Sequence, residues 1–376
     1  MKTFFLTLIS LYFVANVYVS YAVWHLLPSF FALRIAVLLV IIVGFVSPML
    51  FFAFGERLPI ATAGMLYKLG TSWMIAFLYI FIMFLLFDLF KLSNHIFHFA
   101  DTDIVSSLFK QNWQTTLIGF GSILLLLVSG NMVYHNKKRV QIDIESNKVE
   151  QPLKVVAISD LHLGYSISRK ELSKWVKMIN REEPDVVLIA GDLIDNQVRP
   201  LRDQAMHNEL LKLKAPMGVY ACTGNHEFIS GIKESAEFYQ KSGITLLRDS
   251  VATVGSLSII GREDYTNKNR KSFDEIVNGT DLDNFTVILD HQPNNLEDAV
   301  KHNVDLQLSG HTHYGQVFPA SLITRKMFEL AHGYLKKGST HFYVSSGLGI
   351  WGGKFRIGTR SEYIVISIEN KKAVKN

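Results

Sequence analysis

Five short polar stretches in the second half of the sequence combine histidine with aspartate or asparagine. In chain order they read SDLHLG, GDLID, TGNHE, LDHQP and SGHTHYGQ. Carboxylate, imidazole and amide oxygen suit divalent ions such as Mn²⁺, Fe²⁺ or Zn²⁺, and no thiolate is offered. An aspartate can also touch two ions that lie only about 3.5–4 Å apart. The five stretches together therefore predict a site for two divalent metal ions, although each stretch alone is a weak signal.

Each polar stretch follows an apolar run that is typical of a buried β-strand. The runs are LKVVAISD (153–160), DVVLIAGD (185–192), VYACTG (219–224), FTVILD (285–290) and VDLQLSG (304–310). Ligand sites in open α/β sheets gather beyond the carboxyl ends of strands. We therefore expect the five loops to meet at one edge of the fold.

Helical segments alternate with these strands. RKELSKWVKMIN places Leu172, Trp175, Val176 and Ile179 on one face, and further helices are expected near 231–241 and in NNLEDAV. Two later strands are expected at 341–347 and 363–368. The alternation indicates an α/β fold in which helices pack on sheets. The single cysteine, Cys222, excludes an intrachain disulfide and is expected to be a small buried strand residue.

The first third of the chain has a different composition. Residues 1–135 hold six of the 38 Lys and Arg residues and four of the 33 Asp and Glu residues. Four apolar stretches each approach the roughly 20 residues that a membrane-spanning helix needs. We expect four spans in 1–135, a juxtamembrane connector in 136–152 and a soluble domain in 153–376, and we disfavour a cleaved signal peptide because three more spans follow the first. The spans are Phe4–Trp24, Phe31–Phe54, Leu69–Phe90 and Thr115–Tyr134.

The charges flanking the spans predict an orientation. One side of the membrane would carry six basic residues, including the cluster Lys137–Arg139, and the other side three. The positive-inside rule then places the C-terminal domain in the cytoplasm, at the inner or plasma membrane. We expect Asp88 to lie near the membrane interface, at the end of the third span. The net charge of +5 comes without nucleic-acid motifs, so the expected partner is the lipid bilayer and no nucleic acid.

Residues 153–368 resemble the calcineurin-like metallophosphoesterase superfamily, whose signature is D-x-H, GD, GNH[DE], a lone H and GHxH. All five blocks are intact, and the longer phrases, SSGLGIWG among them, resemble its membrane-attached branch. That branch includes transmembrane metallophosphoesterases and UDP-2,3-diacylglucosamine pyrophosphatase-like proteins. The resemblance implies a β-sandwich of two sheets flanked by helices, with the metals at one edge. Tyr314 stands where the branch more often has glycine, and we expect it to narrow or line the site.

The resemblance also implies roles for individual residues. One metal would be held by Asp160, His162 and His313, a second by Asn225, His291 and His311, and Asp192 would bridge them. His226 would be the catalytic residue that stands off the metals, contacts phosphate and protonates the leaving oxygen. Two divalent ions are the implied cofactors, with Mn²⁺ expected first and Fe²⁺ or Zn²⁺ as alternatives.

These observations predict a membrane-anchored, dinuclear metal-dependent phosphohydrolase that cleaves a phosphoester or pyrophosphate bond. The spans favour a lipid-linked substrate such as UDP-2,3-diacylglucosamine. One alternative is a phosphodiesterase or phosphatase that acts on a soluble nucleotide, with the helices as a tether. Another is a metal-binding membrane sensor or scaffold without turnover, against which the intact His226 argues.

Two basic segments have open interpretations. Residues 322–337 mix apolar and basic side chains, which fits either an interfacial flap or a basic helix packed on the domain. Arg356 and Arg360 are candidates for contact with substrate phosphate.

Overall fold

The computed structural model describes residues 2–278 and 280–371. The chain divides into two compact units, residues 1–131 and residues 132–376.

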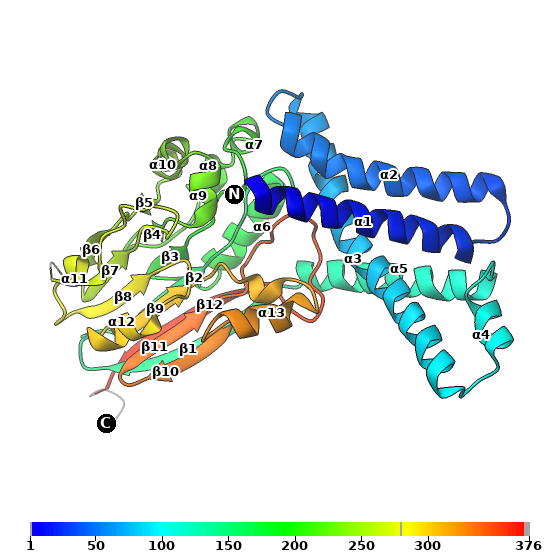
Figure 1. The fold of residues 1–376 in the computed structure, drawn as a ribbon. Coiled ribbons are helices and arrows are strands. Elements are labelled where there is room, and N and C mark those ends of the chain that lie inside the picture. The colour runs from blue at the N-terminus through cyan, green and yellow to red at the C-terminus, as the bar shows by residue number, and fades with distance from the viewer. Residues whose placement is uncertain (1, 279, 372–376) are drawn as a thin grey trace. The chain divides into compact units, whose positions relative to one another are not determined.

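The first unit is helical. It contains α1 (Lys2–Leu26), α2 (Phe31–Phe54), α3 (Ile60–Phe97), α4 (Thr102–Leu108) and most of α5 (Trp113–His135) (Figure 1). All of these except the short α4 are long and apolar enough to cross a membrane, which confirms the expected four spans. At 38 residues, α3 is longer than the predicted third span, because no proline interrupts the helix beyond its apolar centre.

Close helix packing holds the first unit together. Val19, Val23, Ile41, Phe77 and Phe84 are buried in one cluster that joins α1, α2 and α3. Gly70 of α3 lies against the backbone of α2, where a Cβ atom would come within 2.7 Å of the Pro48 nitrogen. Glycine at this position lets two helix backbones approach, which is how apolar helices associate within lipid.

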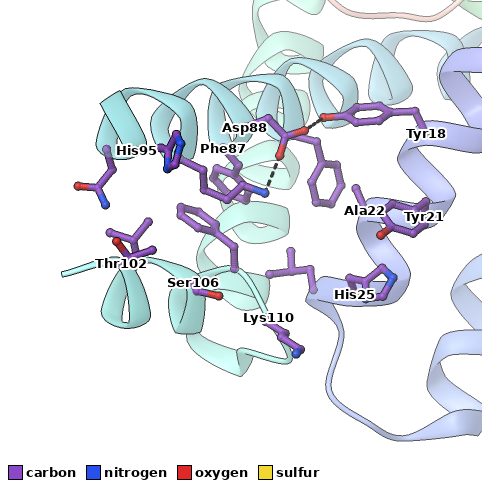
Figure 2. Close-up of a pocket in the computed structure, with 16 residues that line it drawn as sticks. Tyr18, Tyr21, Ala22, His25, Phe87, Asp88, His95, Thr102, Ser106 and Lys110 are labelled. Carbon is purple, nitrogen blue, oxygen red and sulfur yellow. Dashed lines mark hydrogen bonds and ion pairs between the residues drawn. The ribbon is translucent and has the colours of Figure 1, made fainter. Parts of the chain in front are cut away.

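A pocket of about 470 Å³ with both polar and apolar lining residues lies where the ends of α1 and α3 meet α4 (Figure 2). Asp88 accepts a hydrogen bond from the Tyr18 hydroxyl at 2.5 Å, and its other oxygen lies 2.6 Å from the Lys91 ammonium group. His25 and His95 also line the pocket. Pairing with Lys91 neutralises the carboxylate, which lowers the free energy of placing it in an apolar bundle.

The second unit consists of two six-stranded sheets. Their strand orders are β1-β12-β2-β3-β4-β5 and β10-β11-β9-β8-β7-β6. The strands are β1 (Lys138–Ser146), β2 (Leu153–Ile158), β3 (Val186–Ala190), β4 (Val219–Cys222), β5 (Thr245–Leu246), β6 (Ser250–Val254), β7 (Leu257–Gly261), β8 (Phe285–Leu289), β9 (Leu306–Ser309), β10 (Gly333–Lys337), β11 (Thr340–Val344) and β12 (Glu362–Asn370).

Helices cover the outer face of each sheet. Residues of α6 and α10 pack with β2 and β3 on one side, and residues of α11 and α12 pack with β7 and β8 on the other (Figure 1). Between the sheets, side chains such as Val155, Leu188, Val287 and Leu306 form a shared core. The expected helix-flanked pair of sheets is therefore confirmed. The helices are α6 (Arg169–Asn180), α7 (Arg199–Asp203), α8 (His207–Leu210), α9 (Asn225–Ile229), α10 (Ile232–Lys241), α11 (Phe273–Val277), α12 (Leu296–Lys301) and α13 (Ala320–Met327).

The strand directions explain how the polar loops meet. β2, β3 and β4 are parallel in one sheet, and β8 and β9 are parallel in the other. The two groups also end at the same edge, because His291 after β8 contacts the Ala190 carbonyl at the end of β3 at 2.8 Å. The five loops that follow these strands are thereby gathered at one edge of the sandwich.

Residues 136–152, which we expected to be a connector, contain a strand instead. β1 pairs in parallel with β12, from Lys138 opposite Glu362 to Ser146 opposite Asn370. Ile142 and Ile144 are buried, and the polar residues between them face outward. This alternation of apolar and polar residues is short and lies among charged residues. For that reason the sequence alone predicts a connector here and not a strand.

Candidate metal site

The structure brings the sequence-predicted ligands together at the shared edge of the two sheets. Ligand atoms of Asp160, His162 and His313 lie within 4.8 Å of one another, and so do those of Asp160, Asp192 and His291. The two remaining predicted ligands pair with each other, since His311 Nδ1 lies 2.9 Å from Asn225 Oδ1. Contacts between the loops of different strands therefore link all seven residues.

The first group is centred on Asp160. Its Oδ1 atom lies 3.5 Å from His313 Nε2 and 4.0 Å from His162 Nε2. The two Nε2 atoms face each other at 2.9 Å. Two imidazole nitrogens that converge beside a buried carboxylate are arranged as ligands for a cation.

The second group is centred on Asp192. Its Oδ2 atom lies 3.1 Å from His291 Nε2 and 3.7 Å from His162 Nε2. His291 Nδ1 lies 2.8 Å from the Ala190 carbonyl and donates to it. Burial acts to lower the pKa of His291, but the charge of Asp192 and its hydrogen bond raise this pKa well above its usual value. A cation bound here would take the place of the proton on Nε2. One carboxylate oxygen of Asp192 thus lies between a histidine of the first group and a histidine of the second.

Burial and charge act against each other in this site. Burial alone raises the pKa of Asp192, but the neighbouring His291, His226 and His162 hold it well below its usual value. Burial lowers the pKa of His313 well below its usual value, and the charge of His162 adds to that effect. A buried, ionised carboxylate beside a neutral imidazole fits the binding of a divalent cation, which needs deprotonated ligands.

The backbone of the site adopts an uncommon conformation. Five of the predicted ligands have φ between +45° and +69°, in the left-handed region that non-glycine residues rarely occupy. Such residues cost about 1–3 kcal/mol each and cluster at functional sites. The ligands concerned are Asp160, His162, Asp192, His311 and His313.

Two glycines of the motifs are required by close approach. A Cβ atom on Gly224 would lie 2.2 Å from Asp192 Oδ1, and one on Gly310 would lie 2.3 Å from Asp160 Oδ2. Any larger residue would displace the carboxylates on which the two groups are centred.

His226 lies at the rim of the site and is partly exposed. Its Nδ1 atom is 3.1 Å from the Asp195 carbonyl, and its ring stands perpendicular to that of His162, with 4.5 Å between centroids. The ligand atoms of His162, Asp195 and His226 also lie within 4.8 Å of one another. The geometry therefore allows two roles for His226. It can stand beside the predicted metal ligands, or it can itself be a metal ligand.

Sequence reasoning missed Asp195 and Glu227, although both lie within the quoted motifs. Glu227 is buried and accepts hydrogen bonds from the backbone nitrogens of Asp192, Ile194 and Gly224, and from the Tyr239 hydroxyl. Burial, with the charge of Asp192 added, raises the pKa of Glu227 to about 7. Glu227 therefore ties the GDLID loop to the TGNHE loop. The acidic residue after the histidine of TGNHE was the available signal.

Replacing Glu227 with alanine is expected to destabilise the protein by about 3 kcal/mol or more, because buried donors lose their acceptor. The measurement is the thermal midpoint of the full chain in detergent. Glu237→Ala is the control, since Glu237 forms an exposed ion pair with Arg202 and should cost under about 1 kcal/mol. Equal midpoints for the two variants would contradict the role of Glu227.

Arg356, a candidate for contact with substrate phosphate, is buried, and its guanidinium is hydrogen-bonded to backbone carbonyls. It is 1% exposed, and its guanidinium donates to the backbone carbonyls of His313 at 2.8 Å, Ser346 at 2.6 Å and Gly349 at 3.0 Å. Its role is to fix the loop that carries His313.

Tyr314 directs its ring away from the metal ligands that precede it. The ring stacks on His332 at 4.8 Å, and the hydroxyl accepts a hydrogen bond from Arg325. It lines a separate cavity with Lys138 and Arg360. We expected Tyr314 to narrow or line the metal site; in the structure its side chain lines this adjacent cavity.

Comparison with known proteins agrees with the fold. Residues 153–315 match the family model for calcineurin-like phosphoesterases. A metallophosphoesterase of Campylobacter jejuni is 30% identical over 67% of this chain and 68% of its own length. The chain therefore belongs to the calcineurin-like phosphoesterase family, and its second unit is a metallophosphoesterase domain.

For two further relatives, the match covers a smaller share of the relative's own length. A metallophosphoesterase of Helicobacter pylori strain J99 is 33% identical over 57% of this chain, and the chain spans 60% of that relative's length. A transmembrane protein with a metallophosphoesterase domain from Danio rerio is 33% identical over 60% of this chain and 56% of its own length. The similarity thus includes relatives that are named as membrane proteins.

Proposed function

We propose that this protein is a membrane-anchored phosphohydrolase that uses two divalent metal ions. Asp160, His162 and His313 would hold one ion, Asn225, His291 and His311 the other, and Asp192 would bridge them. The observation that carries the proposal is the position of Asp192 Oδ2, 3.7 Å from His162 and 3.1 Å from His291. An anionic oxygen between two imidazole groups is what a bridging ligand requires.

The bound ions would supply a hydroxide at neutral pH and neutralise charge on the phosphate. The chain itself supplies the rest of the chemistry. The Asp195 carbonyl holds the Nδ1 side of the His226 ring, which leaves the opposite nitrogen for the substrate. His226 would donate its proton to the leaving oxygen, because the charge of an alkoxide needs neutralising as the bond breaks.

The preferred substrate class is a lipid-linked phosphoester or pyrophosphate such as UDP-2,3-diacylglucosamine. Support comes from the four candidate spans and from the names of the membrane relatives. We expect Mn²⁺ as the native metal, a location in the inner or plasma membrane with the catalytic domain in the cytoplasm, and no nucleic-acid partner.

The proposal is tested by turnover measurements on the full chain purified in detergent, with added Mn²⁺ or with a chelator. The substrates are a phosphomonoester, a phosphodiester, a cyclic nucleotide and UDP-2,3-diacylglucosamine. We expect chelator-sensitive turnover that is fastest on the lipid. Turnover of soluble nucleotides alone would favour the tethered-phosphodiesterase alternative, and no turnover at all would favour a sensor or scaffold.

A further inference from the structure

The metallophosphoesterase domain carries an exposed apolar patch beside its metal site. Among the described residues of 136–371, seven large hydrophobic side chains are exposed, and four of them lie in 318–327. Leu322, Ile323 and Met327 share the outward half of α13, and Phe318 precedes the helix. A concentration of this kind on one short segment marks an interaction surface.

Basic side chains surround this patch. Lys326 lies between the apolar residues of α13, and Lys138 and Arg360 line a neighbouring cavity of about 380 Å³. All three side chains are exposed, and none forms a salt bridge with another described residue. The Arg325 guanidinium of α13 donates to the hydroxyl of Tyr314, which lines the same cavity, so this hydrogen bond connects α13 to the cavity.

A candidate membrane-spanning helix ends close to this cavity in the chain. α5, a candidate span, ends at His135, and β1 begins at Lys138, so only two residues separate them. The three Cα–Cα steps from His135 to Lys138 reach at most about 11 Å. Val133, near the end of α5, lines the cavity, and Tyr134 is fully buried in the core of the domain. The cavity therefore lies where a membrane-spanning helix joins the domain.

We propose that residues 318–327, together with Lys138, Lys326 and Arg360, form a surface that lies against the bilayer and binds the phosphate groups of anionic lipids. The apolar side chains would enter the boundary between headgroups and acyl chains, and the cations would contact the headgroups. Each cation near an anionic bilayer adds electrostatic attraction to the surface. Apolar side chains next to unpaired cations fit a lipid surface better than they fit a protein partner.

The position of the surface has a consequence for the metal site. Tyr314 directly follows His313, and Phe328, the residue after α13, has its ring 6.1 Å from that of His311. Contact between α13 and the bilayer would hold the metal site close to the level of the lipid headgroups. The inference does not depend on turnover and holds for any substrate.

Depth measurements on the full chain in nanodiscs test the proposal. An Ile323→Cys variant carries a fluorophore on its new thiol, and lipids with a spin label near the headgroup act as quenchers. Leu211→Cys is the matched control, because Leu211 is 55% exposed, similar to Ile323 at 61%, and lies on the domain outside the patch. Cys222 is buried and should stay unlabelled.

We expect quenching at position 323 to be several-fold stronger than at position 211. Equal quenching at the two positions would overturn the proposal, and so would protection of position 323 by a co-purifying protein. Asp192→Asn in the same background should leave the quenching unchanged. Loss of activity and loss of lipid contact are thereby distinguished.

A second measurement tests the cations. The Lys138→Gln, Arg360→Gln double variant is compared with Lys233→Gln, Lys241→Gln, in which both replaced lysines are exposed residues of α10. Adding about 30 mol% phosphatidylglycerol to nanodiscs of uncharged lipid should increase quenching at position 323 in the Lys233→Gln, Lys241→Gln control. It should not do so in the Lys138→Gln, Arg360→Gln variant. The same rise in both pairs would contradict binding of anionic lipid at this cavity.

Discussion

Replacing Asp192 with asparagine is expected to reduce metal-dependent turnover by about a thousandfold, which corresponds to about 4 kcal/mol of transition-state stabilisation. Asparagine keeps an oxygen that can accept the hydrogen bond from the His226 backbone nitrogen, now 2.9 Å from Asp192 Oδ1. It removes the negative charge that lies between His162 and His291. The fold should therefore persist while the affinity for metal falls.

Two measurements check this result for Asp192→Asn. Elemental analysis of the purified chain should show fewer metal ions per chain, and the thermal midpoint in the presence of chelator should stay close to that of the unsubstituted protein. Asp203→Asn is the control, because Asp203 is exposed on α7. Full metal content together with full activity in the Asp192 variant would exclude the bridging role.

Replacing His226 with alanine should leave metal content unchanged and lower turnover by about 10²–10⁴-fold on a substrate with a poor leaving group. A substrate with a good leaving group, such as a nitrophenyl ester, needs little protonation of the leaving oxygen. The variant's turnover of such a substrate should therefore fall much less. The dependence on leaving group separates a proton donor from a residue that only shapes the site.

The ligand geometry makes metal content the decisive readout for the His226 variant. His162, Asp195 and His226 are close enough to hold an ion themselves. If His226→Ala loses an ion and slows equally on both kinds of substrate, His226 is a ligand and not the acid. His207→Ala on α8 is the control for loss of a partly exposed histidine.

The membrane spans and the metal-binding motifs were predictable because both are local signals. A run of apolar residues that matches the thickness of a bilayer needs no tertiary information. The strands before the five polar loops were also predictable, since they are buried on both faces and read as continuous apolar runs. Strand β1 was missed because its alternation is short and lies among charged residues. It is an edge strand that is stabilised by pairing with β12 and by the burial of Ile142 and Ile144.

The roles of several polar residues depended on contacts with backbone groups. Arg356 was a candidate phosphate ligand, and the structure shows its donors satisfied by the carbonyls of His313, Ser346 and Gly349. Glu227 received no role from the sequence, and it accepts backbone hydrogen bonds from two loops. Every residue has the same backbone groups, so no sequence pattern reveals where such partners lie.

The sequence by itself determined that this chain has four apolar spans followed by a domain with five metal-binding motifs on strand ends. The tertiary structure alone decided which ligands meet. His162 and His313 are 151 residues apart in sequence and 2.9 Å apart in space, because parallel strands of the two sheets end at one edge. It also placed Tyr314 in one cavity with Val133, near the end of α5. This proximity depends on how distant segments pack, and local residue patterns do not encode it.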